Sequence, residues 1–317
     1  MAAVTLKNIS KTYDKGKVKA VNDISFQVEQ GELFGLIGPD GAGKTSIFRI
    51  LTTVLLADNG EATVGGLDVV KEYRAIRNKV GYMPGRFSLY QDLTVVENLE
   101  FFATIFKTTI RENYDLIKDI YEQIEPFKNR PAGKLSGGMK QKLALCCALI
   151  HKPEVLFLDE PTTGVDVVSR KEFWEMLNRL KKQGISMLVS TPYMDEASLC
   201  DRIALIQNGN IMSLDTPQKI MDGFPALLYA VKSKDIYRLL KDFRSDPAVE
   251  TCYAFGEWLH LTTKDDKNGN GVIDRLAAQY QAEDFEAKVI KPSIEDSFIR
   301  LMQEKQKTET LNDHYES

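Results

Sequence analysis

A glycine-rich segment near the start of the chain has the residue types that bind phosphate. It consists of Gly38, Pro39, Asp40, Gly41, Ala42, Gly43, Lys44, Thr45 and Ser46. Its glycines let backbone N–H groups approach phosphate oxygens without a Cβ in the way. Lys44 adds a positive charge, and the Thr45 hydroxyl is a suitable ligand for Mg²⁺. The segment therefore predicts a nucleotide site in which these residues contact the phosphates and the metal.

The elements on either side of this segment strengthen the prediction. We expect an apolar strand over residues 32–37 and a helix from about Lys44 to Leu51. The helix would direct the positive end of its dipole at the phosphates. A strand, a glycine-rich loop and a helix in this order are the context in which such a loop is a specific signal for nucleotide binding.

Two carboxylates follow a second apolar strand, which we expect over residues 155–158. Asp159 closes this strand, and Glu160 comes directly after it. In ATPases with a phosphate-binding loop, an acid at the end of such a strand holds Mg²⁺. Asp159 is therefore a candidate metal ligand together with Thr45. The plain alternative is a pair of acids at a strand end.

A third segment lies between the loop and the acids and reads Leu135-Ser136-Gly137-Gly138-Met139-Lys140-Gln141. Ser136 is a favourable N-cap residue, so the simplest interpretation is that it begins a helix. In this order the three segments resemble those of the ATP-binding subunits of ABC transporters, and the resemblance extends over roughly residues 4–220.

The resemblance implies roles that the residues alone do not. Glu160 would be the general base that polarises the attacking water. Ser136 to Gly138 would contact ATP held by the phosphate loop of a second subunit. Asp166 lies in a segment that resembles the D-loop of the family and would contact that partner. Tyr13 would stack on the adenine ring.

Three positions depart from the family pattern. Gly85 stands where a glutamine would reach Mg²⁺ and signal to the membrane subunit. Pro192 stands where a histidine would contact the γ-phosphate, and proline has no side-chain donor. Asp40 stands where asparagine is common, and Mg²⁺ and Lys44 would offset much of its charge.

Because of Gly85 and Pro192, we expect the chain's own ATP site to turn over slowly. Each loss of a preorganised contact to the transition state costs roughly 10²–10³ in rate. Arg86 and Tyr193 are adjacent, and either of them or a water molecule is a possible substitute. The intact segment at Ser136 would then act on the ATP of a partner, which favours a heterodimer with a second ATP-binding subunit over a homodimer.

The alternation of strands and helices predicts an α/β fold. With the resemblance, this becomes a P-loop NTPase core of the ABC type over residues 1–221. It would have a mainly parallel sheet, an N-terminal antiparallel β region and a helical subdomain at about 89–150. Short alternating segments over residues 222–303 predict a small C-terminal α+β domain. The polar residues 304–317 predict a disordered tail.

Composition and a further resemblance narrow the function. The net charge of −4 argues against a general nucleic-acid binder. No apolar run approaches the ~18 residues of a membrane span, which predicts a peripheral protein. Residues 292–298 resemble a short segment near the end of ATPase subunits of ABC-2-type exporters. The resemblance implies an ATPase that uses ATP and Mg²⁺ to drive export through separate integral membrane permease subunits, at the cytoplasmic face of the plasma (inner) membrane.

Two other functions remain open from the sequence. One is a soluble ABC protein without a membrane partner, which would act on ribosomes or DNA. The lack of a tandem second ATPase domain or a basic linker counts against it. The other is a clamp that binds ATP and never hydrolyses it, and the retained Glu160 counts against that.

Overall fold

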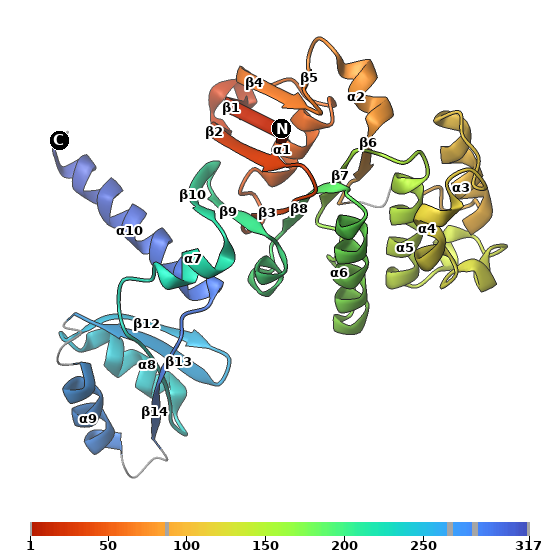
Figure 1. The fold of residues 1–317 in the computed structure, drawn as a ribbon. Helices are drawn as coiled ribbons and strands as arrows, with labels where there is room; N and C mark the ends of the chain where they lie inside the picture. Colours follow the sequence, from red (N-terminus) through yellow and green to blue (C-terminus); the bar gives the residue numbers. More distant parts are fainter. Residues whose placement is uncertain (1, 86–88, 265–268, 281–284, 316–317) are drawn as a thin grey trace. The chain divides into compact units, whose positions relative to one another are not determined.

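The computed structural model describes residues 2–85, 89–264, 269–280 and 285–315. The chain divides into two compact units, whose elements are labelled in Figure 1. Met1–Pro217 and Leu301–Ser317 form the first unit, and Gln218–Arg300 form the second.

The first unit is built on a six-stranded sheet with the strand order β10-β9-β3-β8-β7-β6. These strands are β3 (Leu33–Ile37), β6 (Val80–Met83), β7 (Val155–Asp159), β8 (Ser186–Thr191), β9 (Arg202–Gln207) and β10 (Asn210–Asp215). All neighbours pair in parallel except β10 with β9. Every residue of β3, β7 and β8 is buried, as is typical of a parallel sheet that is covered on both faces.

The parallel direction of these strands positions the site. β8 lies between β3 and β7, so the three carboxyl ends meet at one edge of the sheet. The segments that follow them are the glycine-rich loop after β3, the acids at the end of β7, and residues 190–192 at the end of β8. Ligand sites of open α/β sheets form at this edge.

A second, antiparallel sheet of the first unit has the order β2-β1-β4-β5. Its strands are β1 (Ala2–Tyr13), β2 (Val18–Glu29), β4 (Asn59–Val64) and β5 (Leu67–Asp68). Apolar residues of β1 and β2 alternate inward and share a core with Phe34 of β3 and Phe48. The sequence missed β4 and β5, which are short and contain or adjoin glycines.

The helices of the first unit include one over the predicted residues 44–51 and three within the predicted helical region at about 89–150. They are α1 (Lys44–Leu51), α2 (Tyr73–Lys79), α3 (Val95–Ile105), α4 (Tyr114–Tyr121), α5 (Gly137–Leu149) and α6 (Val167–Lys182), and α7 (Pro217–Asp222) begins at the last residue of the first unit and continues in the second. Thr94 and Glu97 form a capping box that starts α3. Together with the two sheets, these helices confirm the predicted α/β fold with a P-loop NTPase core. No helix in the described ranges has both the length and the apolar character needed to cross a membrane.

The second unit has a split βαβ topology, which is called ferredoxin-like. Its elements are β11 (Leu228–Lys232), α8 (Ile236–Ser245), β12 (Val249–Phe255), β13 (Trp258–Thr263), α9 (Gly269–Tyr280) and β14 (Glu286–Ile290). The antiparallel sheet has the order β12-β13-β11-β14. Leu239 and Phe243 of α8 pack with Tyr229 and Leu259 in its core.

The last helix, α10 (Ile294–Tyr315), differs from the expectation of a disordered tail from residue 304. The residues in question include Glu, Lys, Gln and Leu, which are good helix formers, and no proline interrupts them. The polar composition that suggested disorder is therefore equally compatible with continuation of a helix.

Candidate nucleotide-binding site

The loop between β3 and α1 passes close to neighbouring backbone at two glycines. A Cβ on Gly38 would collide with the carbonyl oxygen of Ile206, and a Cβ on Gly43 with that of Ala20. Gly43 also has a φ of 104°, in the left-handed region, and it is the N-cap residue of α1. These two positions therefore need glycine both to form the loop and to start the helix behind it.

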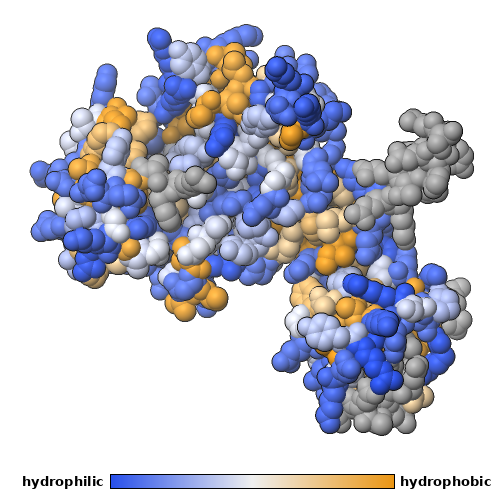
Figure 2. Space-filling view, turned by 180° about the vertical axis from the view of Figure 1, so that it is seen from behind, coloured by the Kyte–Doolittle hydropathy of each residue, from blue (hydrophilic) through white to orange (hydrophobic). Residues whose placement is uncertain are grey.

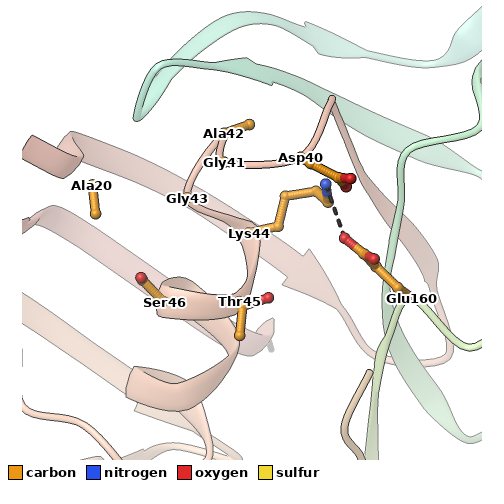
Figure 3. Close-up of a pocket in the computed structure, with 9 residues that line it drawn as sticks. All are labelled: Ala20, Asp40, Gly41, Ala42, Gly43, Lys44, Thr45, Ser46 and Glu160. Atoms are coloured by element: carbon orange, nitrogen blue, oxygen red, sulfur yellow. Dashed lines mark ion pairs between the residues drawn. The ribbon is translucent and has the colours of Figure 1, made fainter. Parts of the chain in front are cut away.

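A cavity of about 380 Å³ opens over this loop, and Lys44 and Glu160 point toward each other in it (Figure 3). Lys44 is buried, and its Nζ donates to the carbonyl oxygens of Gly38 at 2.7 Å and Pro39 at 2.9 Å. The same Nζ lies 3.1 Å from Glu160 Oε1. A phosphate chain would bring more negative charge to Lys44 than one carboxylate does. It would therefore compete with Glu160 for the ammonium group.

The rest of the cavity wall comes mainly from the predicted segment. The other lining residues are Ala20, Asp40, Gly41, Ala42, Gly43, Thr45 and Ser46. Asp40 is exposed, so its charge lies where solvent screens it. Thr45 and Ser46 belong to the first turn of α1 (Figure 3). Residues 40–46 of the predicted segment thus line one cavity, whereas Gly38, Pro39 and the candidate metal ligand Asp159 are not among its described lining residues.

Tyr13, the last residue of β1, lies beside this first turn. Its hydroxyl is 3.0 Å from Ser46 Oγ, and its side chain is partly exposed. Its stacking on adenine stays a prediction.

The two acids after β7 are held by Ser190 at the end of β8. The Ser190 hydroxyl donates to Asp159 Oδ1 at 2.6 Å, and it accepts a hydrogen bond of 2.9 Å from the Glu160 N–H. Asp159 and Ser190 are also register partners in the sheet. Glu160 has a φ of 51°, an uncommon conformation for a residue with a side chain, which marks this junction as a strained segment that its surroundings must support.

The sequence analysis did not single out Ser190. Its position at the end of a predicted strand is the sequence signal that could have identified Ser190. It ends a buried strand beside a strand that ends in the candidate metal ligand, and carboxyl ends of parallel strands meet at one edge.

Positions 85 and 192 both lie at the site, although neither residue has a side chain that donates a hydrogen bond. A Cβ on Gly85 would lie 3.1 Å from the carbonyl oxygen of Asp159 and 3.8 Å from Glu160 Cβ. Pro192 follows Thr191, whose carbonyl oxygen accepts a hydrogen bond from the N–H of Gly38 at 3.2 Å. A larger side chain at either position would start next to the acids or the loop.

One of the possible substitutes for these side chains is engaged elsewhere. The Tyr193 ring packs against the Arg170 guanidinium, which lies 4.0 Å from its centroid. Arg170 is itself paired with Glu196 at 3.0 Å and Asp195 at 3.2 Å. Tyr193 therefore faces α6. Arg86, the other possible substitute, lies outside the described residues.

Buried hydrogen bonds tie the switch segment after β8 to the segment after the acids. Glu196 is almost fully buried and accepts from the hydroxyls of Thr191 at 2.5 Å and Thr162 at 3.1 Å. Arg170 of α6 donates to the same carboxylate. This network, which the sequence did not reveal, joins both loops to the start of α6.

The Ser136 segment has the expected helix start but lies apart from the cavity wall. Ser136 is the N-cap of α5 and accepts from the Met139 N–H at 3.3 Å. Gly138 packs so closely on Ser169 that a Cβ would lie 2.7 Å from its Oγ. Gly137 lies near Gly164 in the D-loop-like segment. The described residues that line the Lys44 cavity do not include Ser136 to Gly138.

The D-loop-like segment, Pro161 to Asp166, is fixed at both ends. The Gln141 side chain of α5 donates to the Pro161 carbonyl oxygen. Asp166 is the N-cap of α6 and accepts from the Ser169 N–H at 3.0 Å, and this hydrogen bond lowers the pKa of its carboxyl. The next two residues, Val167 and Val168, are 77% and 68% exposed. This arrangement presents an acid and two apolar side chains at the surface.

Comparison with known families and proteins agrees with this geometry. The model of the ABC transporter family matches residues 21–163. The Nod factor export ATP-binding protein I of Rhizobium sp. (strain N33) is 33% identical, over 94% of this chain and 96% of that protein. The doxorubicin resistance ATP-binding protein DrrA of Mycobacterium tuberculosis (strain H37Rv) is 37% identical, over 69% of this chain and 67% of its own length.

A longer relative matches almost the whole chain. The probable multidrug ABC transporter ATP-binding protein YbhF of Escherichia coli (strain K12) is 35% identical over 95% of this chain, and the chain spans only 52% of that relative. Among solved structures, a dimeric ATP-binding cassette in a post-hydrolysis state with ADP and Pi superposes with a TM-score of 0.61. That cassette is 26% identical, and the match covers 67% of this chain and 98% of the cassette.

Proposed function

Because this chain belongs to the ABC transporter family of ATP-binding proteins, we propose that it hydrolyses ATP to drive export through separate membrane permease subunits. Three relatives carry names that refer to multidrug transport, Nod factor export or doxorubicin resistance. These names support export over import, and the permease subunits would select the substrate. The chain would sit peripherally at the cytoplasmic face of the plasma (inner) membrane.

The cavity around Lys44 is the observation that carries this proposal. It combines a loop in which two positions require glycine with the buried ammonium group of Lys44. Glu160 forms an ion pair with this ammonium group. Lys44 would bind the β- and γ-phosphates, with backbone N–H groups of the loop around them. The adenine would lie against Tyr13. Once phosphate competes for Lys44, Glu160 would be free to orient and polarise a water molecule.

The residues present fit a magnesium ion. Thr45 offers a hydroxyl and Asp159 a carboxylate, and Mg²⁺ prefers oxygen ligands with several waters retained. Ser190 donates to Oδ1 of Asp159, and Oδ2, which receives no hydrogen bond from the described residues, would be available to an ion or its water. When bound, Mg²⁺ would neutralise charge that develops on the phosphates. Thr45 and Asp159 are the side chains that we assign to it.

A second ATP-binding subunit would complete the site. Ser136 to Gly138 start a helix, and the positive end of a helix attracts anions. Because this segment does not line the Lys44 cavity of its own chain, its natural target is ATP on a partner. Asp166 would contact that partner. The dimeric cassette among the similar structures supports such an assembly.

The ATP site of this chain would hydrolyse ATP slowly. We therefore expect the chain to form a heterodimer with a second ATP-binding subunit whose own site is intact. Gly85 lies next to Asp159 and Glu160. Pro192 directly follows β8, whose last carbonyl accepts from the N–H of Gly38. At both positions, a glutamine or histidine side chain would start close to the bound phosphates and metal. Tyr193, which faces Arg170, does not fill the gap.

An apolar groove gives the permease a place to dock. It has a volume of about 370 Å³, and Arg77, Tyr82, Phe102, Ile105, Phe106 and His151 are among its lining residues. Apolar side chains reach the surface of this unit in patches (Figure 2), and the exposed ones include Val54, Leu56 and Val70. A groove between α3 and the core sheet would pass motion of the helical region to the membrane subunit.

One experiment separates these parts of the proposal. The purified chain is assayed for MgATP hydrolysis alone, and then Glu160→Gln is compared with it. Slow turnover that Glu160→Gln reduces further supports a hydrolytic site that is impaired. Brisk, cooperative turnover that disappears in Glu160→Gln contradicts the impaired site and the need for a different partner. Failure to bind ATP at all contradicts the function itself.

Membrane association is tested separately. The tagged chain should co-purify with membranes when its permease is present, and Ile105→Glu in the groove should release it into the soluble fraction. Retention of the Ile105→Glu variant would contradict the assigned docking surface.

A further inference from the structure

The Ser190 hydroxyl makes two hydrogen bonds that reach both acids of the candidate site. Its O–H donates to Asp159 Oδ1 at 2.6 Å, and its oxygen accepts from the Glu160 N–H at 2.9 Å. Ser190 has no exposed surface. A hydroxyl has only one hydrogen to donate, and here the carboxylate takes it. The direction of both hydrogen bonds is therefore fixed.

The hydrogen bond from Ser190 constrains the orientation of the Asp159 carboxylate. Oδ1 accepts the Ser190 hydrogen, whereas Oδ2 receives no hydrogen bond from the described residues, so Oδ2 is the oxygen with both lone pairs available to a ligand. Among the described residues, Ser190 is the hydrogen-bond partner of this carboxylate. Outer-shell partners of this kind orient a metal ligand and tune its affinity.

The same hydroxyl supports the backbone of Glu160. The Glu160 N–H also lies 3.1 Å from the Ser190 carbonyl oxygen, so both oxygens of Ser190 hold one amide. The Glu160 φ of 51° requires such support, because a residue with a side chain rarely adopts it. The direction in which the Glu160 side chain leaves the backbone follows from this conformation.

The position of Ser190 in the sheet links these acids to the phosphate loop. Ser190 pairs with Leu36 of β3 on one side and with Asp159 of β7 on the other. The next carbonyl, that of Thr191, accepts from the Gly38 N–H. Pro192, which lies two residues after Ser190, has no side-chain donor for a phosphate. The end of β8 thus acts on the site through Ser190 and Thr191.

We propose that Ser190 is a positioning residue, which orients Asp159 toward Mg²⁺ and fixes the backbone from which Glu160 reaches the cavity. This inference rests on the proposed binding of ATP with Mg²⁺. It assigns Ser190 no contact with substrate.

The test measures how Mg²⁺ strengthens binding of a fluorescent ATP analogue, mant-ATP, to the full chain. We expect Ser190→Ala to raise the half-saturating Mg²⁺ concentration roughly 10–100-fold, as loss of an outer-shell partner does. Binding of mant-ATP in EDTA should change less than about twofold, since Lys44 and the loop are untouched. Ser190→Thr, which keeps the hydroxyl, should restore the wild-type Mg²⁺ requirement.

Ser186→Ala is the matched control. Ser186 is a buried serine at the other end of β8, and its hydroxyl accepts from the Gly31 N–H at 3.0 Å. Its loss removes a buried hydrogen bond from the same strand away from the acids, so the Mg²⁺ requirement should not move. If Ser190→Ala fails to fold, Ser190→Cys keeps the volume with a weaker donor and should give an intermediate shift.

Two results would overturn the inference. One is an unchanged Mg²⁺ requirement in the Ser190→Ala and Ser190→Cys variants. The other is an equal loss of binding with Mg²⁺ and with EDTA, which is the signature of a purely structural role. A wild-type chain whose mant-ATP binding does not respond to Mg²⁺ would instead contradict the proposed function.

Discussion

The two units each bury an aspartate, and the two carboxylates differ in how completely the protein satisfies them. Asp159 of the first unit is 2% exposed and its carboxylate receives one hydrogen bond from the described residues, that of Ser190. Asp296 of the second unit is 1% exposed and receives four. A buried carboxylate that lacks partners is costly, so it persists where a ligand can complete it.

The partners of Asp296 come from two strands and from the residue that precedes α10. Tyr253 of β12 and His260 of β13 donate to Oδ1 at 2.9 and 2.6 Å. The N–H and hydroxyl of Ser293 donate to Oδ2, and the Asp296 N–H returns a hydrogen bond to Ser293. This reciprocal pair resembles a capping box at the start of α10. Asp296 thus joins the helix to the sheet, whereas Oδ2 of Asp159 receives no hydrogen bond from the described residues.

The comparison is tested most strongly at Asp296. We expect Asp296→Ala to lower the free energy of unfolding of residues 218–300 by about 3–5 kcal/mol, because it leaves buried donors without their charged partner. Hydrogen exchange of β11 to β14 under increasing urea measures this. Glu257→Gln, at the exposed turn of the same sheet, is the control. An effect on mant-ATP binding as large as the effect on stability would contradict a structural role.

The opposite pattern is expected at Asp159. Asp159→Asn should slow single-turnover hydrolysis of MgATP roughly 10²–10³-fold, because it weakens the charge that holds the metal. Its free energy of unfolding should change by less than about 1 kcal/mol, since asparagine keeps an oxygen that accepts from Ser190. Urea unfolding and quenched-flow hydrolysis measure the two quantities. A loss of stability like that of Asp296→Ala would remove the distinction between the two aspartates.

The sequence located Asp159 but not its counterpart, for a physical reason. The glycine-rich loop and the acids are local patterns, and their meaning follows from the ends of parallel strands. Residues 292–298, which include Asp296, were singled out only for a resemblance. The partners Tyr253 and His260, however, lie far along the chain and meet Asp296 only in the folded sheet. No local spacing contains that information.

The same reasoning explains the other misses in the first unit. Ser190 is an ordinary residue of an apolar strand until its register opposite Asp159 is known. The hydrogen bonds of Glu196 to Thr162 and Thr191 also depend on neighbouring loops that converge. The fold class was accessible because hydrophobic periodicity is local. The strand β4 and, in the second unit, β14 were missed because much of their length is exposed, and β5 was missed because it has only 2 residues.

The surroundings of Asp159 also allow a test by gain of function. Gly85→Gln with Pro192→His should raise turnover at this site about tenfold, equivalent to about 1.4 kcal/mol of barrier. The gain is limited because a Cβ at position 85 would lie 3.1 Å from the Asp159 carbonyl oxygen, so the backbone has to adjust.

A control variant separates the effect of the added side chains on hydrolysis from the steric effect of a larger residue at a glycine position. Gly133 stands in the same steric situation, with a Cβ position 3.1 Å from the Gln91 carbonyl oxygen, away from the cavity. Gly133→Gln should leave turnover unchanged. If the double variant is no faster than the wild type, Gly85 and Pro192 are not what limits the site.

The smallest expected effect is a decrease in the stability of the second unit at low pH. Burial alone would raise the pKa of Asp296, but hydrogen bonds from His260 and Ser293 outweigh it and leave the pKa below its usual value of 3.8. A carboxyl whose pKa is lower in the folded state contributes stability that is complete above 3.8 and is lost as the pH falls through the folded value. Hydrogen exchange of residues 228–263 at pH 5 and pH 3 should therefore show a weaker second unit at pH 3.

Asp246, whose pKa is also lowered, beside Arg275, contributes with the same sign, so Asp296→Asn should reduce this pH dependence without abolishing it. Asp246→Asn provides the matched comparison in the same unit. Equal pH dependence in the wild type and in Asp296→Asn would mean that the four hydrogen bonds stabilise the carboxylate no better than water does. The contrast with Asp159 would then rest on geometry alone.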